Sequence, residues 1–320
     1  MTDAPIDRVR ARIAAIFGQW GRGTTLDEMR AGFAELVSHG RRPDMRSLAA
    51  DGVPAGWFGA GDGVILYCHG GGYQMGSLVS HGALMADLAA ASGTRVLGFD
   101  YRLAPEHRYP AALDDAVSVY RWVLDQGVDP ARLAIAGDSA GAGLALATLL
   151  KAREEGFPLP AAAVFLSPWV DMELRGESYE TRAAVDPLTQ KAKVGMMVRA
   201  YIGREGDPSD PYVSPVNGDL AGLPPILIHV GNNETVLGDT ELLQARRRCR
   251  DFGGGSGLGR HDPPLPGLSR VVGSPGIAGA DRRLAARQDR LNRPLTAQPV
   301  PDAFRLRVRG LPNRGNAACA

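Results

Sequence analysis

A serine between two glycines is the residue of this sequence best suited to chemistry. Ser139 stands in Gly137-Asp-Ser-Ala-Gly141, after the apolar run Arg132–Ala136 and before a helical pattern. Because small residues at 137 and 141 permit a sharp turn from strand to helix, we expect a strained serine with an exposed hydroxyl. A hydroxyl presented in this way can attack an acyl carbonyl. The flanking strand and helix favour this interpretation over a plain glycine turn that contains an incidental serine.

Three consecutive glycines could supply the hydrogen-bond donors that such an attack needs. They follow the apolar run Val64–Cys68 and His69. We expect the amides of Gly71, Gly72 and Ala140 to form an oxyanion hole, in which each donor lowers the barrier by about 3–4 kcal/mol. The alternatives are a flexible loop or a phosphate cradle, and the absence of a following Gly-Lys-Ser/Thr argues against phosphate binding. We expect His69 to stabilise this loop rather than to act as a base.

Short apolar runs alternate with helical stretches from about residue 50 onward. The runs are Val64–Cys68, Arg95–Phe99, Arg132–Ala136, Ala162–Ser167 and Pro225–Val230, and the helical stretches lie around 80–92, 111–126, 140–155 and 189–202. This alternation predicts the α/β class, a mainly parallel sheet with helices on both faces. In such sheets function collects at the carboxyl ends of the strands.

Six motifs occur in an order and spacing that together are highly specific. They are His69-Gly-Gly-Gly72, Asp100-Tyr-Arg-Leu-Ala-Pro-Glu-His107, Tyr109-Pro-Ala-Ala-Leu-Asp-Asp115, Gly137-Asp-Ser-Ala-Gly141, Leu166-Ser-Pro-Trp-Val-Asp171 and Gly222-Leu-Pro-Pro225. Over roughly residues 50–244 the chain resembles the bacterial hormone-sensitive-lipase-like esterases of the α/β-hydrolase fold. The resemblance implies a serine carboxylesterase for short acyl chains, with no metal and no organic cofactor. It also implies that a histidine takes the proton of Ser139 and that an acid orients that histidine.

The resemblance places the acid at Glu234, when the segment is aligned on the glycine that ends the predicted strand. Glu234 also respects the family's chain order of serine, acid and histidine. Asp239, five residues later, is the alternative acid. The remaining interpretation of Glu234 is an ordinary solvated carboxylate in a loop.

The base is the incomplete part of the pattern. It must follow the acid, which leaves only His261 among six histidines, 27 residues after Glu234. His229 lies inside a predicted strand, and we expect it in the core or in support of the acid. The glycines and prolines around His261 resist the strand, histidine loop and closing helix that the family has there.

The composition changes after residue 245. Residues 1–245 carry a net charge of −9, whereas residues 246–320 contain 15 Arg, no Lys, five Asp and no Glu, a net charge of +10. We hypothesise that this tail is the product of a shifted reading frame. Codons can be chosen that encode Asp251 onward and that, read one nucleotide later, encode LEVEVVWDDMTHL and then a helix. These are the strand, histidine loop and helix that the family has there. As written, the chain is expected to fold poorly beyond 245, with residues 265–320 largely disordered and Ser139 nearly inert.

Composition excludes several other classes of protein. The chain has 320 residues, 44% of them apolar, and a net charge of +1, which argues against a nucleic-acid binder. No apolar run is long enough to span a membrane, and the N-terminus shows no signal peptide. Three scattered cysteines favour a reducing compartment. We therefore expect a cytoplasmic protein with a small-molecule ester as its partner, and the resemblance implies a homodimer.

We expect three regions along the chain. Residues 1–48 form a helical cap segment, 49–245 the α/β-hydrolase core and 246–320 an atypical Arg/Gly/Pro-rich tail. Within the core, 175–210 is expected to form a second cap segment over Ser139, with Tyr73, Trp169 and Met196–Met197 as candidate lining residues. Two other functions stay open: a catalytically impaired binding protein of the same fold that lacks a competent histidine, and an amidase or deacetylase that uses the same machinery.

Overall fold

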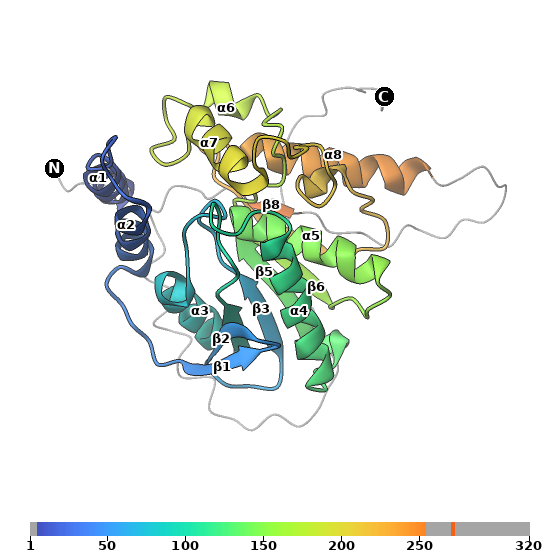
Figure 1. The fold of residues 1–320 in the computed structure, drawn as a ribbon. Coiled ribbons are helices and arrows are strands. Elements are labelled where there is room, and N and C mark those ends of the chain that lie inside the picture. Colours follow the sequence, from blue (N-terminus) through green and yellow to red (C-terminus); the bar gives the residue numbers. More distant parts are fainter. Residues whose placement is uncertain (1–4, 254–269, 273–320) are drawn as a thin grey trace, which may run out of the picture. The chain divides into compact units, whose positions relative to one another are not determined.

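The computed structural model describes residues 5–253 and 270–272 (Figure 1). Its strands are β1 (Arg46–Ala50), β2 (Val53–Phe58), β3 (Val64–Cys68), β4 (Arg95–Phe99), β5 (Leu133–Asp138), β6 (Ala162–Leu166), β7 (Ile226–His229) and β8 (Arg270–Val272). Its helices are α1 (Pro5–Phe17), α2 (Leu26–Ser38), α3 (Leu78–Ser92), α4 (Ala111–Asp125), α5 (Ala140–Glu154), α6 (Ser178–Thr181), α7 (Lys191–Ile202) and α8 (Leu237–Gly253), with short 3₁₀ turns at Pro130–Arg132 and Pro215–Asn217.

The strands of the described residues form one sheet in the order β1-β2-β4-β3-β5-β6-β7-β8. β2 runs antiparallel to both of its neighbours, and the pairs from β4 to β8 are parallel. The five apolar runs of the sequence became β3 to β7, and the four helical stretches became α3, α4, α5 and α7. The predicted α/β class and its mainly parallel sheet are therefore confirmed.

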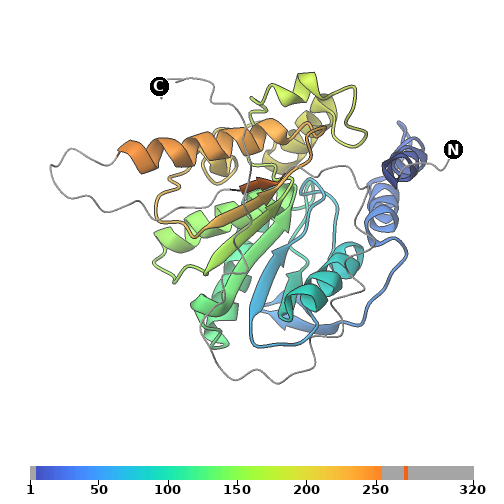
Figure 2. The same cartoon turned by 180° about the vertical axis from the view of Figure 1, so that it is seen from behind.

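Helices cover both faces of the sheet. Alternate side chains of each strand face opposite sides, and apolar side chains on both sides need to be buried. Leu66 and Ile135 belong to the larger buried cluster, to which α4 and α5 contribute. Tyr67 and Ala136, their neighbours along the same strands, belong to a second cluster with side chains of α3. Figures 1 and 2 show these helices on the two sides of the sheet. The carboxyl ends of β3 and β5 are thus held rigidly from both faces.

One hairpin was absent from the sequence prediction. β1 and β2 pair from Arg46 with Trp57 to Ala50 with Val53, across a two-residue turn of Asp51 and Gly52. Both turn residues have positive φ, 49° and 84°, which is the geometry that Asp-Gly favours in tight hairpins. Strand β1 therefore begins inside the segment 1–48 that the sequence assigned to the helical cap.

The far end of the described chain also differs from the expectation. α8 continues to Gly253, past the expected boundary at 245, and residues 270–272 form β8 beside β7. These three residues lie inside the stretch 265–320 that was expected to be largely disordered, and that expectation stays a prediction for the rest of the stretch. The rest of 265–320 and the segment around His261 lie outside the described residues. The structure therefore does not test the hypothesis of a shifted reading frame. No helix in the described ranges is both long and apolar enough to cross a membrane.

Candidate active site

Ser139 occupies the sharp turn between β5 and α5. Its φ and ψ are 52° and −122°, so the strained serine predicted from the sequence is present. Both flanking positions have room for glycine only. A Cβ on Gly137 would lie 2.5 Å from the carbonyl oxygen of Gly141, and a Cβ on Gly141 would lie 2.1 Å from the carbonyl oxygen of Cys68. The serine amide donates to the Leu166 carbonyl at 2.9 Å. Backbone packing alone therefore fixes where the serine stands.

The glycine loop is the second fixed element. Gly71, Gly72 and Tyr73 have positive φ values of 121°, 65° and 60°. A Cβ on Gly71 would lie 2.3 Å from the carbonyl oxygen of Met75, and one on Gly72 would lie 2.5 Å from the sulfur of Met197. The Tyr73 ring, only 2% exposed, stacks on Tyr201 of α7 at 3.8 Å. The loop is thus packed closely against its own backbone and α7, which argues against the interpretation as a flexible loop.

Ser139 and this loop line the same cavity, of about 250 Å³. Its walls come from helices α1, α2, α3 and α7, from the glycine loop and the turn after β5, and from the segments after α1, after β6, before α7 and before α8. They are Phe17, Trp20, Phe33, Leu36, Val37, Gly71, Gly72, Met75, His81, Leu84, Asp138, Ser139, Trp169, Leu188, Thr189, Gln190, Lys193, Val194, Met197 and Val236. The sequence correctly placed Trp169 and Met197 there, whereas Met196 is 59% exposed and Tyr73 is buried beneath the loop. Ala140 is buried at the start of α5, next to the serine.

Asp138, which sequence reasoning left without a precise role, ties the serine turn to the glycine loop. Its Oδ1 accepts hydrogen bonds from the Gly70 amide at 2.9 Å and from the Tyr67 hydroxyl at 2.8 Å. Its Oδ2 lies 3.4 Å from Nε2 of His81. Burial alone would raise the pKa of Asp138, but His81 and these hydrogen bonds outweigh burial and lower it. An ionised carboxylate therefore anchors the loop, and its only sequence signal was its place beside the serine.

Two described histidines, His81 in the cavity wall and His69 before the glycine loop, do not offer an obvious base. Both ring nitrogens of His81 are engaged, one with Asp138 and the other with the Ser80 hydroxyl at 2.8 Å. His69 is buried, stacks on Tyr101 at 4.2 Å, and has its Nδ1 2.9 Å from the Gly70 carbonyl oxygen. Burial, reinforced by nearby His81, lowers the pKa of His69 to about 3. His229 is exposed at the end of β7, so its expected place in the core is wrong.

The two candidate acids have different surroundings. Glu234 is half-buried after β7, and its Oε1 accepts the Gly231 amide at 2.6 Å. Asp239 is 1% exposed in α8, and its Oδ2 accepts the amides of Val170 at 2.9 Å and Asp171 at 3.0 Å. Burial, with a smaller contribution from the Asp171 charge, raises the pKa of Asp239 to about 7. Asp239 therefore holds the loop after β6.

The structure brings together only part of the predicted site. Ser139, Gly71 and Gly72 meet in one cavity, and Glu234 is absent from its lining, although Val236 two residues later is part of it. His261 lies outside the described residues. Within the described ranges, no cluster of three or more His, Cys, Asp or Glu side chains could hold a metal ion.

Known proteins resemble this chain in both sequence and fold. The sequence model of the alpha/beta hydrolase fold family matches residues 65–251. The chain belongs to the α/β-hydrolase fold family. A solved esterase of the bacterial hormone-sensitive lipase family superposes on this α/β-hydrolase with a TM-score of 0.74 and 43% identity, over 78% of this chain and 86% of that one. The resemblance expected from the motifs is therefore confirmed.

Curated relatives match a shorter part of the chain. An acetyl-hydrolase of Streptomyces hygroscopicus is 48% identical over 180 residues, 56% of this chain and 60% of the relative. An esterase of Acinetobacter venetianus is 38% identical over 188 residues, 59% of this chain and 62% of the relative. This α/β-hydrolase thus spans about three fifths of the length of these relatives. The family match ends at residue 251, close to the change of composition after 245.

Proposed function

We propose that this α/β-hydrolase is a serine carboxylesterase that hydrolyses short-chain acyl esters. The observation that carries the proposal is the strained serine turn, which opens into the same apolar cavity as Gly71 and Gly72. The relatives and structural neighbours named esterases and acetyl-hydrolases support the same class of reaction.

In the proposed reaction, Oγ of Ser139 attacks the ester carbonyl carbon while a histidine takes the hydroxyl proton. The carbonyl oxygen becomes an oxyanion and accepts hydrogen bonds from the amides of Gly71, Gly72 and Ala140. When the oxyanion collapses, the carbon–oxygen bond to the alcohol breaks and the histidine gives its proton to the leaving alcohol. Water then attacks the acyl-enzyme by the same route, and the carboxylic acid and the free serine result.

We assign Glu234 as the acid and His261 as the candidate base. Glu234 follows β7 at the carboxyl edge of the sheet, which is where the acid of such a fold is needed. Asp239 is a poorer candidate, because its Oδ2 already accepts two backbone amides of another loop.

The size of the cavity supports a small acyl group. About 250 Å³ lies below the range of ~300–1,000 Å³ that accommodates drug-sized ligands. Aromatic and aliphatic side chains dominate the walls, so an uncharged acyl chain gains free energy there by burial. A cytoplasmic location and a homodimer stay predictions from the sequence.

The direct test is hydrolysis of p-nitrophenyl butyrate by the full chain and by its Ser139→Ala variant. Turnover that falls by ~10⁴–10⁶-fold in the variant supports the proposal, because removing the nucleophile leaves only binding and oxyanion stabilisation. Turnover that survives in the variant contradicts it. Ser92→Ala serves as a control, since Ser92 closes α3 and hydrogen-bonds within its own helix end.

A second candidate function is a small-molecule binding protein without catalysis. It is favoured by the two histidines beside the serine turn, His69 and His81, since one is buried and the other has both nitrogens engaged. Such a protein would bind the ester, and neither the full chain nor its Ser139→Ala variant would release p-nitrophenol. Sequencing of the gene across codons 245–265 shows whether a single-base change restores the histidine segment of the family.

A further inference from the structure

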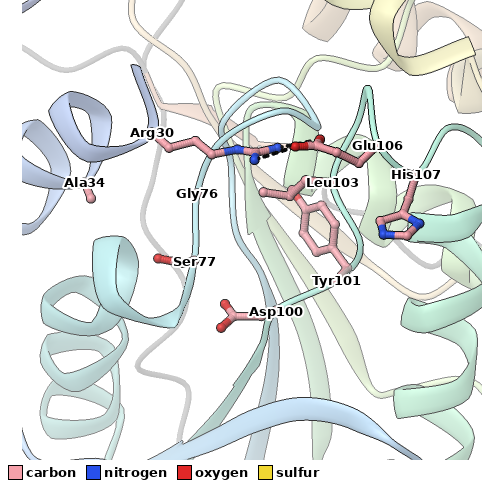
Figure 3. Close-up of a pocket in the computed structure, with 9 residues that line it drawn as sticks. All are labelled: Arg30, Ala34, Gly76, Ser77, Asp100, Tyr101, Leu103, Glu106 and His107. Atoms are coloured by element: carbon pink, nitrogen blue, oxygen red, sulfur yellow. Dashed lines mark hydrogen bonds and ion pairs between the residues drawn. The ribbon is translucent and has the colours of Figure 1, made fainter. Parts of the chain in front are cut away.

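Arg30 connects the second N-terminal helix to the core of the protein. Its two terminal nitrogens donate to the two carboxylate oxygens of Glu106, each at 2.8 Å, as Figure 3 shows. Its Nε donates to the carbonyl oxygen of Gln74 at 2.8 Å, and one terminal nitrogen also reaches that of Ala104 at 3.3 Å. One side chain of α2 thus binds four acceptors on two loops of the core.

Both of these loops belong to the structure that holds the oxyanion glycines. Gln74 lies in the turn in which the Gly71 carbonyl oxygen accepts the amides of Gln74 at 3.2 Å and Met75 at 2.9 Å. The amide of Ala104 donates to the carbonyl oxygen of Tyr73 at 2.8 Å. Arg30 therefore binds α2 directly to the glycine loop and to the loop that supports it.

Side chains of helix α2 line two cavities, and Arg30 lines the one that does not contain Ser139. Phe33, Leu36 and Val37 line the cavity that contains Ser139. Arg30 and Ala34 line a second cavity of about 480 Å³, together with polar groups such as Ser77 and Asp100 (Figure 3). A displacement of α2 would therefore move the wall of the serine cavity.

This ion pair differs from an ordinary surface pair, which contributes little to stability. Its geometry is bidentate, and the Arg30 side chain is only 25% exposed, against 48% for Glu106. The Arg30 guanidinium lowers the pKa of Glu106, chiefly through their hydrogen bonds. Asp27 on the same helix lies farther from the guanidinium, at 3.9 Å. The contacts to the core are thus the short ones.

We propose that Arg30 is a positioning residue that sets acyl-chain selectivity, because its bonds to Glu106, Gln74 and Ala104 latch α2 against the oxyanion loop. This inference rests on the proposed esterase function for its consequence. With the latch in place, Phe33, Leu36 and Val37 keep the cavity short. Without it, α2 moves away and the cavity admits longer chains.

The test compares Arg30→Met with Arg41→Met in the full chain. Arg41 makes an equally short bidentate bridge, at 2.7 Å to each oxygen of Asp87, from the segment after α2 to α3, but it lines neither cavity described above. In Arg30→Met, water in the polar cavity can solvate Glu106, so the core should stay folded. Glu106→Gln is the second variant, since it keeps the shape and removes the charge.

The first readout is hydrogen exchange of the amides of 26–38, which requires no catalysis. We expect exchange about tenfold faster in Arg30→Met, an intermediate change in Glu106→Gln, and less than about twofold change in Arg41→Met. Equal exchange in the Arg30 and Arg41 variants overturns the latch.

The second readout is the ratio of kcat/KM for p-nitrophenyl octanoate to that for p-nitrophenyl acetate. We expect the ratio to rise at least about fivefold in Arg30→Met and to stay unchanged in Arg41→Met. An unchanged ratio in Arg30→Met overturns the selectivity role. If the parent chain shows no serine-dependent turnover, the esterase proposal fails separately, and the ratio of affinities for the two esters in the Ser139→Ala background decides the latch in the same way.

Discussion

The two sides of the candidate site differ in what holds them. On the nucleophile side, Ser139 and Gly71 are fixed by backbone contacts among β3, β5, β6 and the loops that follow them. On the acid side, Glu234 bonds to Gly231 in its own turn, and the candidate base lies outside the described residues. The serine turn is therefore held mainly by backbone contacts at the centre of the sheet, whereas within the described residues the Glu234 side chain hydrogen-bonds in its own turn.

The largest expected effect probes the acid side directly. Glu234→Gln should lower serine-dependent turnover of p-nitrophenyl butyrate by ~10⁴-fold, because the amide can no longer stabilise a charged histidine. The melting temperature should stay the same, since within the described residues the Glu234 side chain accepts one hydrogen bond, from the Gly231 amide of its own turn. If Asp239→Asn abolishes turnover at unchanged stability and Glu234→Gln does not, the assignment of the acid is wrong.

The next prediction concerns the serine turn, which a single added methyl group should disrupt. Gly141→Ala places a Cβ about 2.1 Å from the Cys68 carbonyl oxygen, so β3 and α5 must move apart. We expect a loss of more than about 4 kcal/mol in the free energy of unfolding, measured with urea. Gly23→Ala is the matched control, because nothing lies within 4 Å of its added Cβ. A loss below about 1 kcal/mol at Gly141 would contradict the steric argument.

A third effect is a pH dependence of stability from Asp239. Because burial raises the pKa of Asp239 to about 7, the folded protein binds a proton that the unfolded chain releases near pH 3.8. The wild type should lose up to about 4 kcal/mol relative to Asp239→Asn as the pH rises from 4 to 7. Urea titrations across that range, with the exposed Asp44→Asn as control, measure it. A difference that does not change with pH would exclude the buried, protonated carboxyl.

The smallest of these effects concerns the tether between serine turn and glycine loop. Asp138→Ala leaves the Gly70 amide and the Tyr67 hydroxyl without their acceptor, for an expected loss of about 3 kcal/mol. Asp138→Asn keeps one acceptor oxygen and should lose less. Because the pKa of Asp138 is lowered, its contribution disappears as the pH falls, the opposite sign to Asp239. Thermal unfolding of both variants at two pH values measures this, and equal losses would show that the charge is unimportant.

Local patterns predicted the central sheet well. The buried parallel strands are continuous apolar runs, and helical patterns lie between them, so β3 to β7 and the helices α3, α4, α5 and α7 could be predicted from the residues. The β1–β2 hairpin is absent from the sequence prediction, although Asp51-Gly52 is a strong hairpin signal, because the expected helical segment ends at 48 and takes in the first residues of β1. Tyr73 was assigned to the pocket on its type alone, whereas stacking on Tyr201 buries it.

By itself, the sequence determined the serine turn and the glycine loop, because positive φ and the absence of a Cβ are properties of a few consecutive residues. Only the tertiary structure decided which faces of α1, α2 and α7 close the cavity, that Asp138 holds Gly70, and that Arg30 reaches Glu106. These contacts join residues 68 and 76 positions apart. The type of an apolar or charged residue predicts that it will be buried or paired. Which residue it contacts depends on the tertiary packing, because many partners are compatible with its type.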